Sequence, residues 1–314
     1  MVSSNIQGQL GEALNRLLEN NHRRKDSKPI LVGKDVQLPL WPEPTRGTPN
    51  SWLRGALFAA IQGKERRALK RELLATVAGL QIYFTGWQLD QSDMDVWDTF
   101  VHLSRMQKLG QRVEFSAHSL LVALGRNTGK SDHEWLKNCV ARLYSAGVEI
   151  TIDQHSYFGA MLKGERDDAT GRYTIELDHK LLAMYSAGWT RIDWAERQAL
   201  RRKPLALWLH GWYSSHAKPY PLRVATVQRL SGCRNTQSAS FRRQLVKALD
   251  ELVKIGAIES WTFCDDLVDV VRKPTQAQKK HLTKAAATRS KLGARDTMHI
   301  GAEYSVPRHG IRCI

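Results

Sequence analysis

Two stretches of the chain carry apolar residues at positions i, i+4 and i+7, a spacing that puts side chains on one face of an α-helix. We predict one helix over 131–145 and another over 238–254. Their apolar triplets are Leu136, Val140 and Leu143 in the first helix and Leu245, Leu249 and Leu252 in the second. A glycine follows each helix in the same register, Gly147 or Gly256. Each helix is therefore expected to have one buried side and one polar side.

The first of these helices belongs to a longer series of predicted elements. We predict helices over 90–107, 117–124 and 131–145, a strand over 112–115, and further strands over 148–153, 157–161 and 172–178. Gly125 suits the end of the short helix, because glycine readily adopts the left-handed conformation of a helix C-cap. A helix, a turn, a second helix and then a β-hairpin is the order of a winged helix-turn-helix.

The second half of the chain repeats this order. We predict helices over 203–215, 224–230 and 238–254, and a hairpin of strands 257–263 and 267–272 that turns at Asp265 and Asp266. The segments after the short helices are also alike, Arg126-Asn127-Thr128 in the first half and Arg234-Asn235-Thr236 in the second. A duplicated pattern favours an array of binding modules over a single catalytic centre.

These patterns predict an α+β, helix-rich fold with two tandem winged helix-turn-helix domains, at residues 45–188 and 189–273. An N-terminal arm precedes them at 1–44, with a short amphipathic helix and then a proline-rich stretch that excludes regular helix. A basic tail at 274–314 is predicted to be disordered and to attract phosphate.

The chain is strongly basic, with 47 Lys and Arg against 31 Asp and Glu and a net charge of +16. Such a charge favours a polyanionic partner, because phosphate contacts release counterions. Ten Lys and Arg and two acidic residues lie between Arg272 and Ile314, so much of the excess belongs to the tail. Charge alone does not distinguish DNA from RNA or from an acidic membrane surface.

Composition argues against several other classes of protein. No apolar run approaches the roughly 18 residues of a transmembrane helix, and the first residues lack the pattern of a signal peptide. We therefore expect a cytoplasmic protein associated with the nucleoid or a plasmid. The four cysteines form no Cys-x-x-Cys pair, so neither a disulfide framework nor a metal site is expected, and no cofactor is expected either.

The polar faces of the two long helices supply the candidate DNA-binding residues, because the major groove accepts one α-helix. In the first domain we expect contacts from Arg126, Asn127, Lys130, Ser131, Glu134, Lys137, Asn138, Arg166 and Arg172. In the second we expect them from Arg234, Asn235, Thr236, Ser240, Arg243 and Lys247. Arg243 can pair with guanine, Asn138 with adenine and Glu134 with cytosine. The arginines of the turns and of the first wing suit phosphates, which position the protein without specifying sequence.

Catalytic motifs are weak. The stretch from Gly125 to Ser131 resembles a Walker A loop, but three residues separate its first glycine from Gly-Lys-Ser, where the loop needs four. A helix, not a buried strand, is predicted before it. The aspartates of the helix at 90–107 suit a helix N-terminus better than a nuclease metal site. We therefore expect no enzymatic activity.

The run Leu-Ala-Leu-Trp-Leu-His-Gly-Trp-Tyr-Ser-Ser-His at 205–216, followed by Lys-Pro-Tyr-Pro-Leu at 218–222, resembles the TrfA replication initiators of broad-host-range plasmids. Tyr-Phe-Thr-Gly at 83–86 and the Gly125–Ser131 stretch are similar too, and the resemblance spans about Gln37 to Lys273. It implies an initiator that binds repeats (iterons) at a plasmid origin as a monomer, with the homodimer inactive. It also implies copy-number control, contact with single-stranded DNA of the opened origin, and host DnaA, replicative helicase and sliding clamp as partners.

One short peptide of the arm carries part of this resemblance. Gln37-Leu38-Pro39-Leu40-Trp41 is similar to the Gln-Leu-x-Leu-Phe peptide that docks in the bacterial sliding clamp. An apolar pentapeptide with an aromatic end suits a pocket-docking ligand, so Gln37, Leu38, Leu40 and Trp41 are expected to contact the clamp. The alternative is an arm folded onto the domain. A winged-helix transcriptional repressor, which would not need this peptide, is the alternative function.

Overall fold

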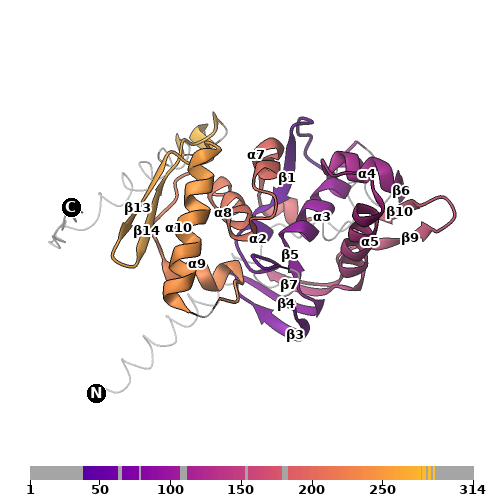
Figure 1. Cartoon of the computed structure of the whole chain (residues 1–314), viewed down its shortest axis with the longest axis horizontal. Coiled ribbons are helices and arrows are strands. Elements are labelled where there is room, and N and C mark those ends of the chain that lie inside the picture. The colour runs from indigo at the N-terminus through magenta and orange to yellow at the C-terminus, as the bar shows by residue number, and fades with distance from the viewer. Residues whose placement is uncertain are drawn as a thin grey trace, which may run out of the picture. The chain divides into compact units, whose positions relative to one another are not determined.

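A computed structural model describes residues 38–62, 66–77, 79–106, 112–152, 155–178, 183–235, 237–276, 278–280, 282–283 and 286. The helix predicted in the N-terminal arm, Gln37, Thr236 and most of the predicted tail lie outside these residues. The described chain mixes helices and strands (Figure 1).

The first half contains, in chain order, α3 (Gln91–Ser104), β6 (Arg112–Ser116), α4 (Ala117–Ala123) and α5 (Lys130–Ser145), as the sequence predicts. β9 (Lys163–Asp167) and β10 (Arg172–Glu176) form an antiparallel hairpin, and β10 also pairs with β6. The strand order is β6-β10-β9. Figure 1 shows this sheet beside α4 and α5.

Two of the predicted strands belong to a separate sheet. β7 (Gly147–Ile152) and β8 (His155–Ala160) extend a sheet begun by β3 (Ala68–Leu74) and β4 (Leu80–Trp87), in the order β3-β4-β7-β8. The strands themselves are confirmed, but they lie outside the β9-β10 hairpin that carries Arg166 and Arg172, the residues predicted for the first wing. The hairpin uses β9 instead, an edge strand with almost no buried side chain. It therefore lacks the alternating pattern from which a strand can be predicted.

The second half contains α8 (Pro204–Ser214), β12 (Leu222–Arg223), α9 (Val224–Ser231), α10 (Ser238–Lys254), β13 (Ser260–Cys264) and β14 (Leu267–Val271). The predicted helices and hairpin are confirmed. The strand order β12-β14-β13 matches β6-β10-β9, since in both sheets the first strand pairs with the last. Gly232 ends α9 with a φ of 64°, and Gly125 follows α4 with a φ of 62°, so both glycines act as expected.

Short elements complete the described chain. They are β1 (Thr45–Pro49), α2 (Asn50–Leu53), β2 (Phe58–Ala59), β5 (Leu89–Asp90), the 3₁₀ helix η2 (Ala183–Ala187), β11 (Trp189–Asp193) and α7 (Trp194–Ala199). β1 pairs with β11, and β2 runs parallel to β5. The β1–β2 region also touches the second half. Trp208 Nε1 donates to the Gly55 carbonyl at 3.0 Å, and the Ala60 amide donates to the Ser231 carbonyl at 2.7 Å.

The buried apolar residues form two clusters. The first runs from Leu38 to Trp194, and the second runs from Leu200 to Val270 and includes Ala60. The change between clusters falls in α7, where Arg197 is 1% exposed. Its guanidinium donates to Asp95 and, at 3.2 Å, to the Gln91 carbonyl. The domain boundary predicted at residue 189 stays a prediction.

The start of the predicted tail is folded against the second half, so the prediction of disorder is wrong there. Gln278 donates to the Ser214 carbonyl at 2.9 Å and accepts a hydrogen bond from Arg272 at 3.1 Å. The Thr275 amide also donates to the Gln278 side chain, at 2.9 Å. The contact from Gln278 satisfies the carbonyl of the last residue of α8, which the charge of the tail alone does not predict.

Candidate nucleic-acid interface

α5 presents a polar face opposite a buried stripe. Leu136, Cys139 and Leu143 are fully buried, and burial raises the pKa of the Cys139 thiol well above its usual range. The predicted DNA-binding residues of this helix and of the turn before it are exposed, namely Asn127, Lys130, Ser131, Glu134, Lys137 and Asn138. α5 therefore has the two-sided character that the sequence predicts.

α10 has the same character with a more cationic face. Phe241, Leu245, Leu249 and Leu252 are fully buried, whereas Arg234, Arg243 and Lys247 are exposed. Ser240 is only partly exposed, and its hydroxyl accepts a hydrogen bond from Asn235 at 2.9 Å. The Asn235 carboxamide also accepts from the Gln237 amide at 3.2 Å. Asn235 thus shapes the turn into α10, whatever it contributes to a ligand.

The arginines predicted to meet phosphates in the first half already have protein partners. Arg126 forms an ion pair with Asp132 at 2.8 Å, and its guanidinium lies 3.7 Å from the centre of the Trp135 ring. Arg172 lies 3.5 Å from Glu114. Arg166 pairs with Asp168 and lies over the Tyr173 ring. These contacts hold the side chains in place, so Arg126 in particular also fastens the turn before α5.

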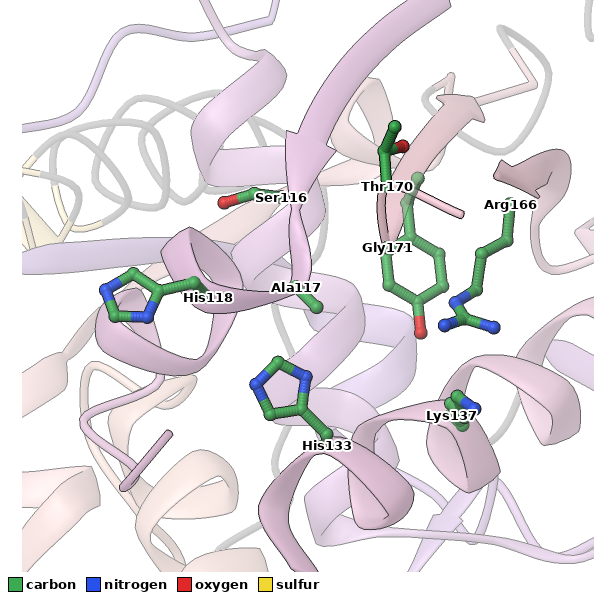
Figure 2. Close-up of a pocket in the computed structure, with 9 residues that line it drawn as sticks. Ser116, Ala117, His118, His133, Lys137, Arg166, Thr170 and Gly171 are labelled. Carbon is green, nitrogen blue, oxygen red and sulfur yellow. The ribbon is translucent and has the colours of Figure 1, made fainter. Parts of the chain in front are cut away.

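A small cavity lies between α4, α5 and the β9-β10 hairpin (Figure 2). Its volume is about 150 Å³, and it is lined by Ser116, Ala117, His118, His133, Lys137, Arg166, Thr170, Gly171 and Tyr173. Figure 2 shows His133 and Lys137 on α5 and Arg166 on the hairpin around one hollow, with His118 on the α4 side. Burial raises the pKa of Tyr173, so its phenol stays neutral.

His118 and His133 are candidate site residues that sequence reasoning missed. Their place in the site depends on β9, which was not predicted, and on the pairing of β10 with β6. The only available signal was the position of His133 three residues before Leu136, which puts it on the edge of the apolar stripe.

A second, wider recess borders the other side of α5. It is lined by Arg66, Asp90, Ser92, Ser131, Glu134, Trp135, Asn138 and Arg142, with a volume of about 640 Å³. Beneath it the buried Asp93 carboxylate pairs with Arg142 at 2.8 Å and Arg66 at 3.0 Å. Asp90 caps α3 by accepting hydrogen bonds from the Ser92 and Asp93 amides, the role expected of an acid at a helix start.

The described part of the peptide predicted to dock in a clamp is folded onto the first core, which is the alternative that the sequence left open. Leu38 is 3% and Trp41 4% exposed, while Leu40 is 57% exposed. Trp41 Nε1 donates to His102 Nδ1 at 3.0 Å, and its ring stacks on Tyr185. The physical reason is that a large indole in a proline-rich segment finds an apolar pocket on its own chain.

The contact with His102 is consistent with a neutral imidazole. Burial lowers the pKa of His102 to about 4, so Nδ1 can accept from Trp41 while Nε2 donates to Glu43 at 2.9 Å. Hydrogen bonds from Arg105 and His102 lower the pKa of Glu43 to about 2. The segment around Trp41 is therefore anchored by both apolar and polar contacts.

The described residues contain neither a cluster of metal ligands nor a membrane-spanning helix. Among those residues no group of three His, Cys, Asp or Glu is arranged to hold a metal ion. None of the helices in the same part of the chain combines the length and apolarity that crossing a membrane requires.

Comparisons with known proteins relate this chain to one family. The model of the TrfA protein family matches residues 5–272. The chain is similar to the plasmid replication initiator protein TrfA of Escherichia coli, with 27% identity over 254 residues, 76% of this chain and 66% of the relative. The match thus spans just under two thirds of that relative's length.

Solved structures with a similar fold come from another protein. Domains 2 and 3 of RctB align with a TM-score of 0.51 at 10% identity, covering 73% of this chain and 99% of theirs. A second crystal structure of RctB domains 2–3 gives a TM-score of 0.46 at 9% identity, covering 70% and 96%. At such low identity the first alignment shows similarity of fold alone.

Proposed function

The chain belongs to the TrfA family, and from that premise we propose that it is a plasmid replication initiator that binds the repeated sequences (iterons) of a plasmid origin. One observation carries the proposal. α5 and α10 each expose a polar, partly cationic face opposite a buried stripe, and they occupy the same place in two orders of elements that match apart from β7 and β8, which are inserted in the first half. A catalytic domain has no need for such a repeated face, whereas a reader of duplex DNA does.

The order of elements supports two winged helix-turn-helix modules. In each half a helix is followed by a strand, two helices and a hairpin, and the first strand pairs with the last strand of that hairpin. In this proposal α5 and α10 are the recognition helices that lie in the major groove, and the β9-β10 and β13-β14 hairpins are the wings. A monomer with two such modules reads two segments of one repeat.

The exposed side chains divide into two roles. Arg243 and Asn138 have the donor and acceptor groups for bidentate contacts to guanine and adenine. Lys130, Lys137 and Lys247 are exposed and suit phosphates as flexible point charges. Arg126 and Asn235 act mainly on the protein itself, since each is bound to neighbouring residues.

Binding to repeated DNA tests this function directly. The full chain should bind a duplex that carries the origin repeat more tightly than a scrambled duplex, by about 10³-fold or more at on the order of 150 mM salt. Fluorescence anisotropy with both duplexes measures the ratio. Equal affinities would refute sequence-specific initiation and leave only non-specific attraction to a polyanion.

Contact with a host sliding clamp is part of the proposal and carries a structural condition. Leu38 and Trp41 are buried, so the peptide must leave the first core before a clamp can bind it. Leu40→Ala should abolish capture by a purified clamp, whereas Leu73→Ala, a matched change at an exposed leucine of β3, should not. Both leucines are more than half exposed, so each change should alter stability by less than about 0.5 kcal/mol. Equal capture by both variants would contradict the clamp contact.

The remaining host contacts and the change between monomer and homodimer are proposed as well. DnaA, the replicative helicase, single-stranded origin DNA and an inactive homodimer are proposed because the chain belongs to this family.

We also propose that the protein acts by binding alone. The Walker-like stretch follows α4 and ends inside α5, so it is the turn of a helix pair instead of a loop after a buried strand. Titration calorimetry with ATP and magnesium should show no binding heat, for the wild type and for Lys130→Ala alike. Binding that Lys130→Ala removes would overturn this part of the proposal.

A further inference from the structure

The residues that line the cavity between α4, α5 and the first wing differ from those at the matching places of the second half. Leu136 matches Leu245 in the two long helices, so His133 corresponds to Arg242 and Lys137 to Val246. Arg166 faces Tyr173 across the first hairpin, as Phe263 faces Val268 across the second. Arg166 and Tyr173 are therefore replaced by Phe263 and Val268.

At the matching place of the second wing, Arg242 is engaged by the wing itself. Its turn is Asp265-Asp266, and Arg242 lies over the Phe263 ring at 4.2 Å and donates to the Asp265 carbonyl at 3.1 Å. The first wing has a longer turn that leaves a hollow between Thr170, Gly171 and α5. The two modules thus differ in what lies between wing and helix.

The chemistry of the first hollow suits a phosphate. Its lining supplies four side chains that are cationic or can become so, His118, His133, Lys137 and Arg166. Hydroxyls of Ser116 and Tyr173 add hydrogen-bond donors at the same place. A volume of about 150 Å³ accepts a phosphate group and excludes a nucleobase with its sugar. The hollow also opens beside the predicted reading face of α5, where a DNA backbone would run.

We propose that this cavity holds one backbone phosphate of duplex DNA, with His118 and His133 as ligands beside Lys137 and Arg166, and that it makes DNA binding by the first module depend on pH. The inference rests on the proposed function, because the phosphate belongs to a bound duplex. The second module, without the histidines, binds independently of pH over the same range.

The direction of the pH dependence follows from the charges around the histidines. His133 shares the cavity with Lys137 on its own helix, His118 on α4, and Arg166 and Tyr173 on the wing. Asp168 is paired with Arg166, and Glu134 lies on the exposed side of α5. A phosphate bound among these groups favours the protonated, cationic form of an imidazole over its neutral form, so binding is coupled to proton uptake. Binding is therefore tighter at pH 6 than at pH 8.

The test compares the affinity of the full chain for the origin repeat at pH 6, 7 and 8 and at several salt concentrations. The wild type should bind about tenfold more tightly at pH 6 than at pH 8, the effect of one linked proton over a pH unit. The double change His118→Gln with His133→Gln should remove that dependence. Arg166→Gln should lower the slope of log affinity against log salt by about one, as expected for one lost phosphate.

Two control variants change arginines outside the cavity. Arg172→Gln, on the same wing but outside the cavity, and Arg242→Gln, at the matching place of α10, should both keep the wild-type pH dependence. Thermal melts check that each variant is folded. Unchanged pH dependence in the histidine double variant would overturn the inference while a preference for the repeat still supports the proposed function. Loss of that preference in the wild type would refute the proposed function itself.

A further experiment distinguishes the binding of a DNA backbone phosphate from the binding of a free phosphate ion. The imidazole signals of His118 and His133, followed by NMR, should shift when duplex DNA is added at micromolar concentration and should not shift with the same concentration of inorganic phosphate. Equal shifts with inorganic phosphate would assign the cavity to a small anion and contradict the backbone contact.

Discussion

α3 and α8 occupy the same place in the two halves, each before the first strand of a three-stranded sheet, but different forces hold them. α3 carries the buried acids Asp93 and Asp98, and Asp95 pairs with Arg197. In α8 every residue from Leu205 to Ser214 is buried, and most of them are apolar. The first module thus adds buried charges to its apolar core, whereas the second relies mainly on apolar contact.

This difference has consequences for stability. Buried ion pairs depend on geometry and on protonation, because an unpaired buried charge is costly. Apolar contact has no comparable dependence on pH. The first half also carries the inserted β3-β4-β7-β8 sheet, whose β7 follows directly after α5. Besides its buried stripe, α5 is therefore held by a polar network and by a second sheet, whereas α10 relies mainly on its buried stripe.

The largest expected effect is at Asp93. Asp93→Ala would leave Arg66 and Arg142 without their shared carboxylate, and breaking a buried pair in this way costs about 3–5 kcal/mol. Urea denaturation of the full chain should show that loss. Asp269→Ala, at an exposed acid of β14, should change stability by less than about 0.5 kcal/mol. Similar losses for the two variants would mean that the polar network does not hold the first half together.

Asp98 makes the stability of the first half depend on pH. Burial raises the pKa of Asp98 to about 7, so the folded protein keeps a proton that the unfolded chain releases near pH 4. That stabilisation is complete below about pH 4 and is lost as pH rises through 7. Asp98→Asn, which can still accept from Thr48, should exceed the wild type by about 4 kcal/mol at pH 8 but by only about 1–2 kcal/mol at pH 5.

Urea denaturation at both pH values measures this difference, with Asp269→Asn in the second half as control. If the asparagine variant follows the wild-type pH profile, Asp98 is ionised in the folded protein and the contrast between the halves weakens.

A smaller effect tests the contact between the halves. Gly232 and Gly256 both have positive φ, 64° and 75°, so an alanine at either pays a similar backbone cost of about 1 kcal/mol. A Cβ at Gly232 would lie 2.9 Å from the Cβ of Ala59, whereas at Gly256 no described atom is within 4 Å. Gly232→Ala should therefore be less stable than Gly256→Ala by about 1–3 kcal/mol. Equal melting temperatures would show that the β1–β2 region moves freely against α9.

The sequence predicts the helix pairs well because each depends on local periodicity. The stripe at Leu245, Leu249 and Leu252 and the glycine after each short helix are read without knowledge of distant contacts. The sheets are predicted less well from the sequence. β9 has no buried face, and β7 and β8 differ from wing strands only in their partners, β4 and each other. Pairing between strands that are far apart in the sequence gives no signal in the local pattern of apolar and polar residues.

The same limit applies to the candidate site. Exposed residues such as Arg243, Lys247 and Asn138 were found because helical geometry places them opposite the apolar stripe. His118 joins the site only because β10 returns to β6, and Trp41 leaves the surface only because Tyr185 and Trp189 lie beside it. Tertiary contacts of this kind decide which polar and aromatic residues are free to meet a ligand.

We propose that α5 and α10 both read bases. The most direct test is to measure binding affinity for every single-base change of one origin repeat. Wild type, Asn138→Ala and Arg243→Ala are compared, with Lys70→Ala on β3 as control. Each reading variant should lose about 1–3 kcal/mol of discrimination at its own base position, and the two positions should lie in different parts of the repeat. Loss at one shared position, or at none, would contradict an account in which α5 and α10 both read bases.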